Sequence, residues 1–217
     1  MKKNLVLYDL DGTLVDTKED IAASANHMLR QMGGSSLTVD EVVPYVGRGL
    51  RQLISSCLRT EDAGRVEEGM RIYRAHYARH MLDRSRLYPG ARDILEHFKL
   101  RKQAVITNKP NPYSKDILAG LDIGGYFVEV VGGDSEHPKK PDPAAFLFLM
   151  EKTGVSPEET LFVGDSVIDI RAGRAAGVFT AILTHGFERE ETIRGESPDL
   201  VATGFETLLE IAKDRKW

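Results

Sequence analysis

The stretch LVLYDLDGTLV at residues 5–15 constrains the fold of this chain most. Residues 5–8 are continuously apolar, a pattern typical of a strand buried on both faces of a parallel sheet. Asp9 follows this run directly and Asp11 comes two residues later, so an extended backbone would point both carboxylates the same way. Parallel sheets bind ligands at the carboxyl ends of their strands. The stretch therefore predicts the active-site strand of an enzyme.

Two other readings of the same stretch have to be weighed. Asp-Gly between apolar residues is a strong hairpin signal, so Asp11-Gly12 is about as consistent with a simple turn. A calcium-binding EF-hand loop beginning at Asp9 is excluded, because its sixth position would hold Leu14 in place of Gly and its twelfth would hold Asp20 in place of Glu. The rest of the chain has to decide between the turn and the active site.

Composition excludes several classes of protein. The chain of 217 residues is long enough for one domain, or one domain with a small insertion. Its net charge of -4, its pI near 5.9 and the lack of a basic stripe argue against general binding to nucleic acid or anionic membranes. No apolar run approaches the roughly 20 residues of a membrane span. The N-terminal MKKN leaves no room for a signal peptide, so we expect a cytoplasmic protein.

Residues 16–87 carry only helical patterns. Thr17 to Asp20 resembles a capping box, followed by apolar residues at helical spacing up to Met32. A second capped helix opens at Thr38, and its apolar period continues to Leu58. A third helix is expected at about 66–81. We therefore predict that this block is an inserted all-helical subdomain.

From residue 88 onwards, helices and strands alternate strictly. Helices are expected at 91–99, 113–121, 143–152, 168–176 and 205–213, and strands at 103–107, 127–131, 161–163, 178–183 and 200–202. The polar stretch 188–198 is expected to be a mobile loop. Repeated strand-helix units with short connections predict a three-layer α/β fold around a Rossmann-like parallel sheet.

Polar side chains follow several of the predicted strands, so they should meet at one edge of the sheet. Thr107 and Asn108 offer a hydroxyl, a side-chain amide and backbone N–H groups, all donors suited to phosphate oxygens. Lys140 is held before Pro141 near a helix start, where its ammonium can act as a point charge on phosphate. For each of these the ordinary alternative is a polar turn or a solvated lysine.

Asp165 follows another strand, and Asp169 lies four residues later on the same helix face. Asp165 would also serve as an N-cap of that helix. Four carboxylates near one another would be intolerable without a divalent cation, and Mg²⁺ suits an all-oxygen site. The six histidines are scattered and form no zinc-type pattern.

Taken together, these motifs resemble those of the haloacid dehalogenase superfamily, specifically the phosphoglycolate phosphatase type with a small helical cap. The four segments, in the order of that family, are DLDGT at 9–13, ITNKP at 106–110, KPDP at 140–143 and GDSVID at 164–169. The resemblance covers essentially the whole chain. It implies a catalytic core domain of residues 1–15 and 88–217, and a cap domain of residues 16–87.

The resemblance also implies a role for each matching residue. Asp9 would be the nucleophile that forms an aspartyl-phosphate, and Asp11 would protonate the leaving group and then activate water. The residues that would hold the substrate's phosphoryl group are Gly12, Thr107, the backbone of Asn108, and Lys140. The implied cofactor is Mg²⁺, held by Asp9, the Asp11 carbonyl and Asp165. Asp169 would either bind the metal through water or brace its surroundings.

Within the cap, VGRGL at 46–50 resembles the family's substrate loop, and Arg48 is the candidate for binding a substrate carboxylate, with a surface role as the alternative. The leading hypothesis is thus a Mg²⁺-dependent phosphatase of small anionic phosphate monoesters, with 2-phosphoglycolate the best guess. Alternatives are a phosphosugar mutase, a phosphatase of another small phosphometabolite, and a non-catalytic phosphate-binding protein. Thr13 and Asn108-Lys109 fit the phosphatase pattern better than the mutase one. A monomer or a homodimer is expected.

Overall fold

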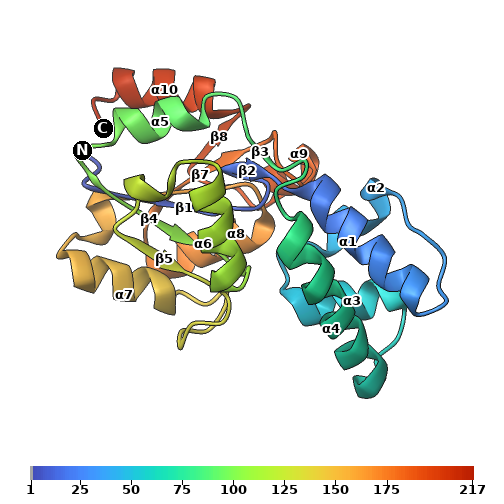
Figure 1. The fold of residues 1–217 in the computed structure, drawn as a ribbon. Helices are drawn as coiled ribbons and strands as arrows, with labels where there is room; N and C mark the ends of the chain where they lie inside the picture. Colours follow the sequence, from blue (N-terminus) through green and yellow to red (C-terminus); the bar gives the residue numbers. More distant parts are fainter. Residues whose placement is uncertain (1) are drawn as a thin grey trace.

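A computed structural model describes residues 2–217 as a six-stranded parallel sheet with helices on both faces and a helical insertion at one end (Figure 1). The strands lie in the order β5-β4-β1-β6-β7-β8. Their bounds are Glu129–Val131 for β5, Lys102–Ile106 for β4, Leu5–Tyr8 for β1, Thr160–Gly164 for β6, Phe179–Leu183 for β7 and Leu200–Ala202 for β8. The predicted α/β fold with a parallel sheet is confirmed.

The position of β1 explains its unbroken apolar sequence. It pairs in parallel with β4 on one side and β6 on the other, and all four of its side chains are fully buried. Val6 and Tyr8 face one hydrophobic cluster, whereas Leu5 and Leu7 face another. Because both faces of the sheet are covered, the residues that point to either face have to be apolar.

Helices cover the two faces of the sheet. The helices α5 (Ala91–His97), α6 (Asn111–Gly120) and α10 (Phe205–Asp214) pack on the face of Val6 and Tyr8. The helices α7 (Ala144–Thr153) and α8 (Val167–Ala176) pack on the opposite face. Two short 3₁₀ turns complete the connections, Gly124–Tyr126 and Pro157–Glu159. The core therefore has three layers, as predicted.

The insertion consists of α1 (Lys18–Gln31), α2 (Val39–Val42), the 3₁₀ turn Val43–Tyr45, α3 (Leu50–Leu58) and α4 (Ala63–His80). It lies to the right of the sheet in Figure 1, with α4 packed against both α1 and α3. Where the chain enters and leaves it, β2 (Val15–Asp16) and β3 (Arg86–Leu87) form an antiparallel ribbon. This ribbon was not predicted, because two residues per strand show no periodicity.

Two expectations for the insertion were wrong in detail. The Thr17 hydroxyl does not cap α1 but donates to Asp11 Oδ1 at 2.6 Å, and Asp20 accepts hydrogen bonds from Ser85 and the Arg84 N–H. The helix opened at Thr38 has its capping box but ends after one turn. A 3₁₀ turn and two glycines with positive φ, Gly47 and Gly49, separate it from α3.

The stretch 188–198 is another difference from expectation. It contains a short helix, α9 (Glu190–Gly195), in place of a mobile loop. Ile193 is fully buried against Ile170 of α8 and Ile182 of β7. One apolar residue in a polar segment gives too weak a periodic signal to predict a helix. The burial of Ile193 depends on residues that are distant in the sequence.

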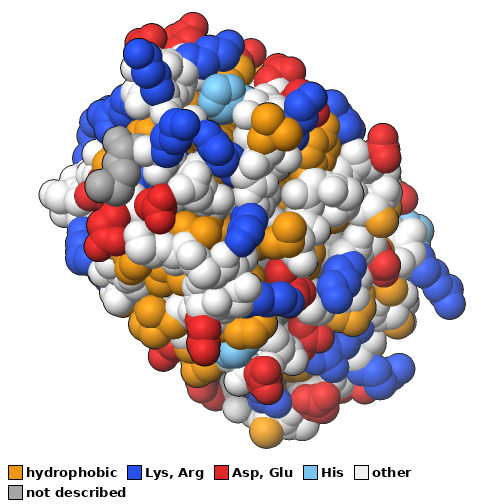
Figure 2. Space-filling view, turned by 90° about the vertical axis from the view of Figure 1, so that its left-hand side faces the viewer, with side chains coloured by type: hydrophobic (Ala, Val, Ile, Leu, Met, Phe, Trp, Pro, Cys, Tyr) orange, Lys and Arg blue, Asp and Glu red, His pale blue; other side chains and the backbone are white. Residues whose placement is uncertain are grey.

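The surface is mixed in charge. On the face shown in Figure 2, Lys and Arg side chains are interspersed with Asp and Glu side chains and do not gather by sign. No helix formed by residues 2–217 combines the length and the apolar character that crossing a membrane requires.

Candidate active site

The end of β1 and the turn after it place two carboxylates at the edge of the sheet. The Asp9 N–H donates to the Val163 carbonyl at 2.9 Å, which continues the sheet by one residue. A tight turn follows, closed by a bridge between Asp11 and Val15. The turn and the carboxylate pair predicted from this stretch are therefore both present, since the turn is what presents Asp11 beside the strand end.

Gly12 has a conformational and a steric reason to be glycine. Its φ of +86° lies in the left-handed region, and a Cβ added there would lie 2.4 Å from Asp165 Oδ2. Gly12 thus lets the loop after β6 approach the loop after β1. Any side chain at position 12 would keep the two loops apart.

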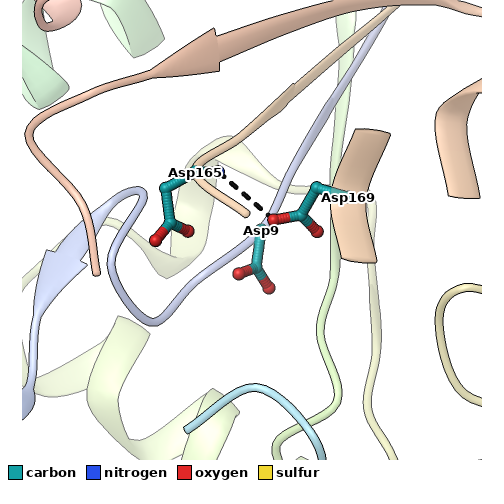
Figure 3. A group of neighbouring side chains, drawn as sticks. All are labelled: Asp9, Asp165 and Asp169. Carbon is teal, nitrogen blue, oxygen red and sulfur yellow. Dashed lines mark hydrogen bonds between the residues drawn. The ribbon is translucent and has the colours of Figure 1, made fainter. Parts of the chain in front are cut away.

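Three carboxylates from two parts of the chain converge at this edge (Figure 3). Asp9, Asp165 and Asp169 are buried, and one oxygen from each lies within 4.8 Å of the others. Asp165 Oδ1 accepts a hydrogen bond from the Thr13 hydroxyl, and Oδ2 accepts one from the Phe187 N–H, both at 2.8 Å. These bonds orient Asp165 toward Asp9, and among residues 2–217 this trio is the group able to hold a metal ion.

Burial makes this cluster hard to ionise fully. Burial raises the pKa of Asp9, Lys140 lowers it and neighbouring Asp169 raises it, with a net value of about 7. Burial also raises the pKa of Asp165, with Asp169 and Asp9 adding to the effect. A divalent cation would relieve both costs, and the all-oxygen donor set suits a hard ion such as Mg²⁺.

Lys140 pairs with two carboxylates of the cluster. Its Nζ is 2.8 Å from Asp9 Oδ1 and 2.7 Å from Asp169 Oδ1. Burial acts to lower the pKa of Lys140, but Asp169 and Asp9 outweigh it and the pKa is raised. The ammonium is therefore charged and held at the carboxylate of Asp9.

Asp169 braces this arrangement. Its Oδ2 accepts hydrogen bonds from the Ser166 N–H and hydroxyl, and its Oδ1 accepts one from Lys140 Nζ. Ser166 and Asp169 together form the capping box of α8, so the N-cap of this helix is Ser166 and the alternative considered for Asp165 is wrong. One carboxylate thus both starts the helix and positions the lysine.

The loop after β4 contributes the residues that follow the second sequence motif. Thr107 is buried at the strand end, where its N–H donates to the Val131 carbonyl at 3.0 Å. Asn108 is also buried, and its side chain bonds to backbone groups of Lys140 and Gly47. Both residues line the same cavity as Asp9.

Lys109 is a site residue to which no role was assigned from the sequence. Its Nζ lies 2.9 and 3.0 Å from the two carboxylate oxygens of Asp11 and 4.7 Å from the centre of the Tyr77 ring of α4. Asp11 is thereby held by Lys109 and Thr17 together. The available signal was the position of Lys109 directly after Thr107-Asn108.

A cavity of about 60 Å³ joins the sheet edge to the insertion. The insertion contributes mostly apolar and aromatic side chains to its wall: Ile21, Tyr45, Val46, Leu50, Leu53, Tyr73 and Tyr77. A water molecule needs about 10–15 Å³ of such space, so the cavity has room for a small ligand. Arg48 is exposed and is not among the lining residues, although Gly47 and Gly49 on either side of it are.

Known proteins share both the sequence and the fold. The family model for haloacid dehalogenase-like hydrolases matches residues 6–183. The chain is 40% identical over 216 residues to a phosphoglycolate phosphatase of Pseudomonas putida, covering 94% of this chain and 78% of the relative. It is 39% identical to phosphoglycolate phosphatase 1 of Pseudomonas aeruginosa, over 96% of this chain and 79% of the relative.

A solved structure agrees with these sequence relatives. The crystal structure of a predicted phosphoglycolate phosphatase from Haemophilus somnus 129pt superposes with a TM-score of 0.93 at 32% identity, covering 98% of this chain and 99% of that one. With the family model matched over most of the chain, this protein belongs to the haloacid dehalogenase-like hydrolases.

Proposed function

We propose that this hydrolase is a Mg²⁺-dependent phosphatase of small phosphate monoesters that works through an aspartyl-phosphate, with 2-phosphoglycolate as its substrate. The observation that carries the proposal is the contact of Asp9 with Lys140 beside Asp165, at the floor of a small cavity roofed by the insertion. The names of the relatives support the choice of substrate.

In the first half-reaction, a carboxylate oxygen of Asp9 attacks phosphorus, and the bond from phosphorus to the substrate's ester oxygen breaks. Asp11 gives its proton to the departing alkoxide. In the second half-reaction, Asp11 takes a proton from water, whose oxygen attacks phosphorus and releases Asp9 and inorganic phosphate. Lys109 supports this role by fixing both oxygens of Asp11.

The phosphoryl oxygens are held by donors at the sheet edge. We assign the Thr107 hydroxyl, the Asn108 N–H and Lys140 Nζ to this task, because the first two follow β4 and the third touches Asp9. Gly12 belongs to the same site through the room that it leaves for Asp165.

The residues present fit a Mg²⁺ ion. Asp9, Asp11, Asp165 and Asp169 supply four carboxylates, and Lys109 and Lys140 supply two ammonium groups, which leaves two formal negative charges unbalanced. We propose that Asp9, the Asp11 carbonyl and Asp165 hold the ion, with Asp169 as the brace of Lys140. When bound, the ion offsets charge on the phosphoryl group.

We also propose the domain division expected from the sequence, with a core of residues 1–15 and 88–217 and a cap of residues 16–87. The β2-β3 ribbon supports it, because the two chain crossings lie side by side at this boundary. Cap residues that line the cavity would then read the non-phosphate end of the substrate. Arg48 could do so only if its loop turned inward, since its side chain is exposed.

The test is a panel of phosphate monoesters with Mg²⁺, ranked by kcat/KM, for the wild-type chain and Asp9→Asn. We expect 2-phosphoglycolate to rank first and the variant to lose turnover by at least about 10⁴-fold with its fold intact. A sugar phosphate converted to its isomer would indicate a mutase. Substantial turnover by the variant would show that the nucleophile is misassigned.

A further inference from the structure

We propose that the Asn108 side chain is a positioning residue that couples closure of the insertion over the cavity to the placement of Lys140. This coupling rests on the phosphatase function proposed above. The backbone N–H of Asn108 and its side chain then have separate tasks, one toward the substrate and the other toward the protein.

The side chain of Asn108 is fully engaged with backbone groups. Nδ2 donates to the Gly47 carbonyl at 2.8 Å and to the Lys140 carbonyl at 2.9 Å, and Oδ1 accepts from the Lys140 N–H at 2.9 Å. Both amide hydrogens are therefore used. The partners also define the orientation of the amide, because a backbone N–H requires Oδ1 and two carbonyl oxygens require Nδ2.

On the core side, these bonds hold the backbone of the phosphate-site lysine. Asn108 bonds both the N–H and the carbonyl of Lys140. From that backbone the ammonium reaches Asp9 at 2.8 Å and Asp169 at 2.7 Å. Any rotation of the Asn108 amide would loosen the segment from which Lys140 extends.

On the insertion side, Asn108 holds the loop that closes the cavity. Gly47 and Gly49 both line the cavity and both have positive φ, +85° and +92°. The neighbouring Lys139 approaches the same loop, since a Cβ added at Gly49 would lie 2.9 Å from its Nζ. The loop is thus seated directly on the segment around Lys140.

These two sides share one amide group, so they must influence each other. If the loop leaves, Nδ2 loses one of its two acceptors and the amide is less restrained against Lys140. If Lys140 is displaced, the donor offered to the loop is displaced with it. Such coupling is reciprocal by necessity. One hydrogen bond of this kind changes an equilibrium by about 2- to 10-fold.

The experiment compares Asn108→Ala with Gly47→Ala, which disturbs the same contact from the other side. A Cβ at Gly47 meets nothing within 4 Å, so alanine only strains the backbone that carries the accepting carbonyl. Gly33→Ala is the matched control, because Gly33 also has positive φ, +74°, and open space, but lies after α1 away from the contact.

The first readout needs no substrate. Trypsin cleaves after Arg48, which is exposed in the loop, and cleavage of a held loop reports the population that has opened. We expect cleavage at the Arg48-Gly49 bond to rise about 2- to 10-fold in Asn108→Ala and Gly47→Ala, and to stay at the wild-type rate in Gly33→Ala. Asn108→Asp keeps an acceptor for the Lys140 N–H but has no donor for Gly47, so it should be cleaved as fast as Asn108→Ala.

The second readout is kcat and KM with 2-phosphoglycolate. Gly47→Ala should lower kcat/KM by about 2- to 10-fold and Asn108→Ala by at least as much, because the latter also breaks the two bonds to Lys140. The double variant should lose little more than Asn108→Ala alone, because that change already breaks the bond to Gly47. Losses that multiply would overturn the coupling, as would unchanged cleavage at Arg48 in Asn108→Ala. A wild-type chain without phosphatase activity would refute the proposed function, whereas the cleavage rates would still decide whether Asn108 holds the loop.

Discussion

At the scale of single residues, the site is a group of charges that cancel only in part. Lys140 pairs with Asp9 and Asp169, and Lys109 pairs with Asp11. Within residues 2–217, Asp165 has only neutral donors, the Thr13 hydroxyl and the Phe187 N–H. Burying a carboxylate on such terms is costly to folding. The arrangement therefore suits the binding of a metal cation and an anionic substrate, at a cost to the stability of the fold.

This cost makes a prediction for Asp9→Asn. The raised pKa of Asp9, about 7 against an ordinary 3.8, means that between about pH 4 and 7 the folded chain keeps a proton that the unfolded chain has released. The free energy of unfolding contributed by this group therefore falls as pH rises through that window. In excess chelator, we expect Asn at position 9 to raise Tm by a few degrees at pH 8, with the gain vanishing near pH 4. A Tm of Asp9→Asn below that of the wild type at pH 8 would contradict this prediction.

The position of Arg48 makes a second prediction at this scale. Because its side chain is exposed and does not line the cavity, Arg48→Ala should change KM for 2-phosphoglycolate by less than about 2-fold, within the effect of an ordinary surface substitution. An uncharged aryl phosphate is the comparison substrate. A KM raised for the carboxylated substrate alone would support the carboxylate-binding role implied by the family resemblance.

At the scale of elements, short-range devices set the geometry of the site and of the insertion. The capping box of α8 turns Asp169 toward Lys140, so helix initiation and lysine placement share one side chain. At the other boundary, the buried carboxylate of Asp20 in α1 accepts from the N–H groups of Arg84 and Ser85 and from the Ser85 hydroxyl. Asp20 thereby ties the start of the insertion to its end.

Asp20→Asn should accordingly destabilise the fold. An amide keeps one acceptor oxygen but turns an NH₂ group toward backbone donors, which leaves buried N–H groups without a partner. We expect a loss of about 2 kcal/mol in the free energy of unfolding, measured by urea denaturation. Asp40→Asn, in the exposed first turn of α2, is the matched control and should stay within about 0.5 kcal/mol. Equal losses of stability in the two variants would show that Asp20 does not tie the start of the insertion to its end.

At the scale of the whole molecule, the cavity exists because the insertion and the sheet edge share it. The largest hydrophobic cluster runs without a break from the sheet face into α1, α3 and α4. Tyr77 of α4 contributes its ring to the Lys109 ammonium that holds Asp11. The chemistry of the core therefore depends on contacts that only the assembled molecule makes.

The proposed metal binding belongs to this scale, because the proposed ligands come from two distant loops. Mg²⁺ that binds only the folded chain should raise Tm with concentration, and excess chelator should abolish phosphate release. Asp165→Asn should lose most of the Tm increase, since one proposed ligand is replaced. Phosphate release that persists in excess chelator would show that the reaction does not require a metal ion.

Much of the fold and the main site residues follow from local sequence signals. The buried strand at 5–8, the alternation of helices and strands after residue 88, and the polar residues at the strand ends are all patterns of short range. Parallel sheets bring strand ends together whatever their separation in sequence, so Asp9, Thr107, Lys140 and Asp165 could be grouped in advance. Helix α9 and the β2-β3 ribbon were missed because their stability comes from partners far along the chain.

Partner choice within the site was decided by the tertiary structure alone. Lys109 and Asn108 are neighbours in the sequence, but the Lys109 side chain binds Asp11, whereas the Asn108 side chain binds Gly47 and Lys140. Nothing in the sequence predicts these different partners. Residue type determines what a side chain can donate or accept, and that much is local. Which partner it meets depends on how three loops and the insertion pack together, and this packing is a property of the folded chain.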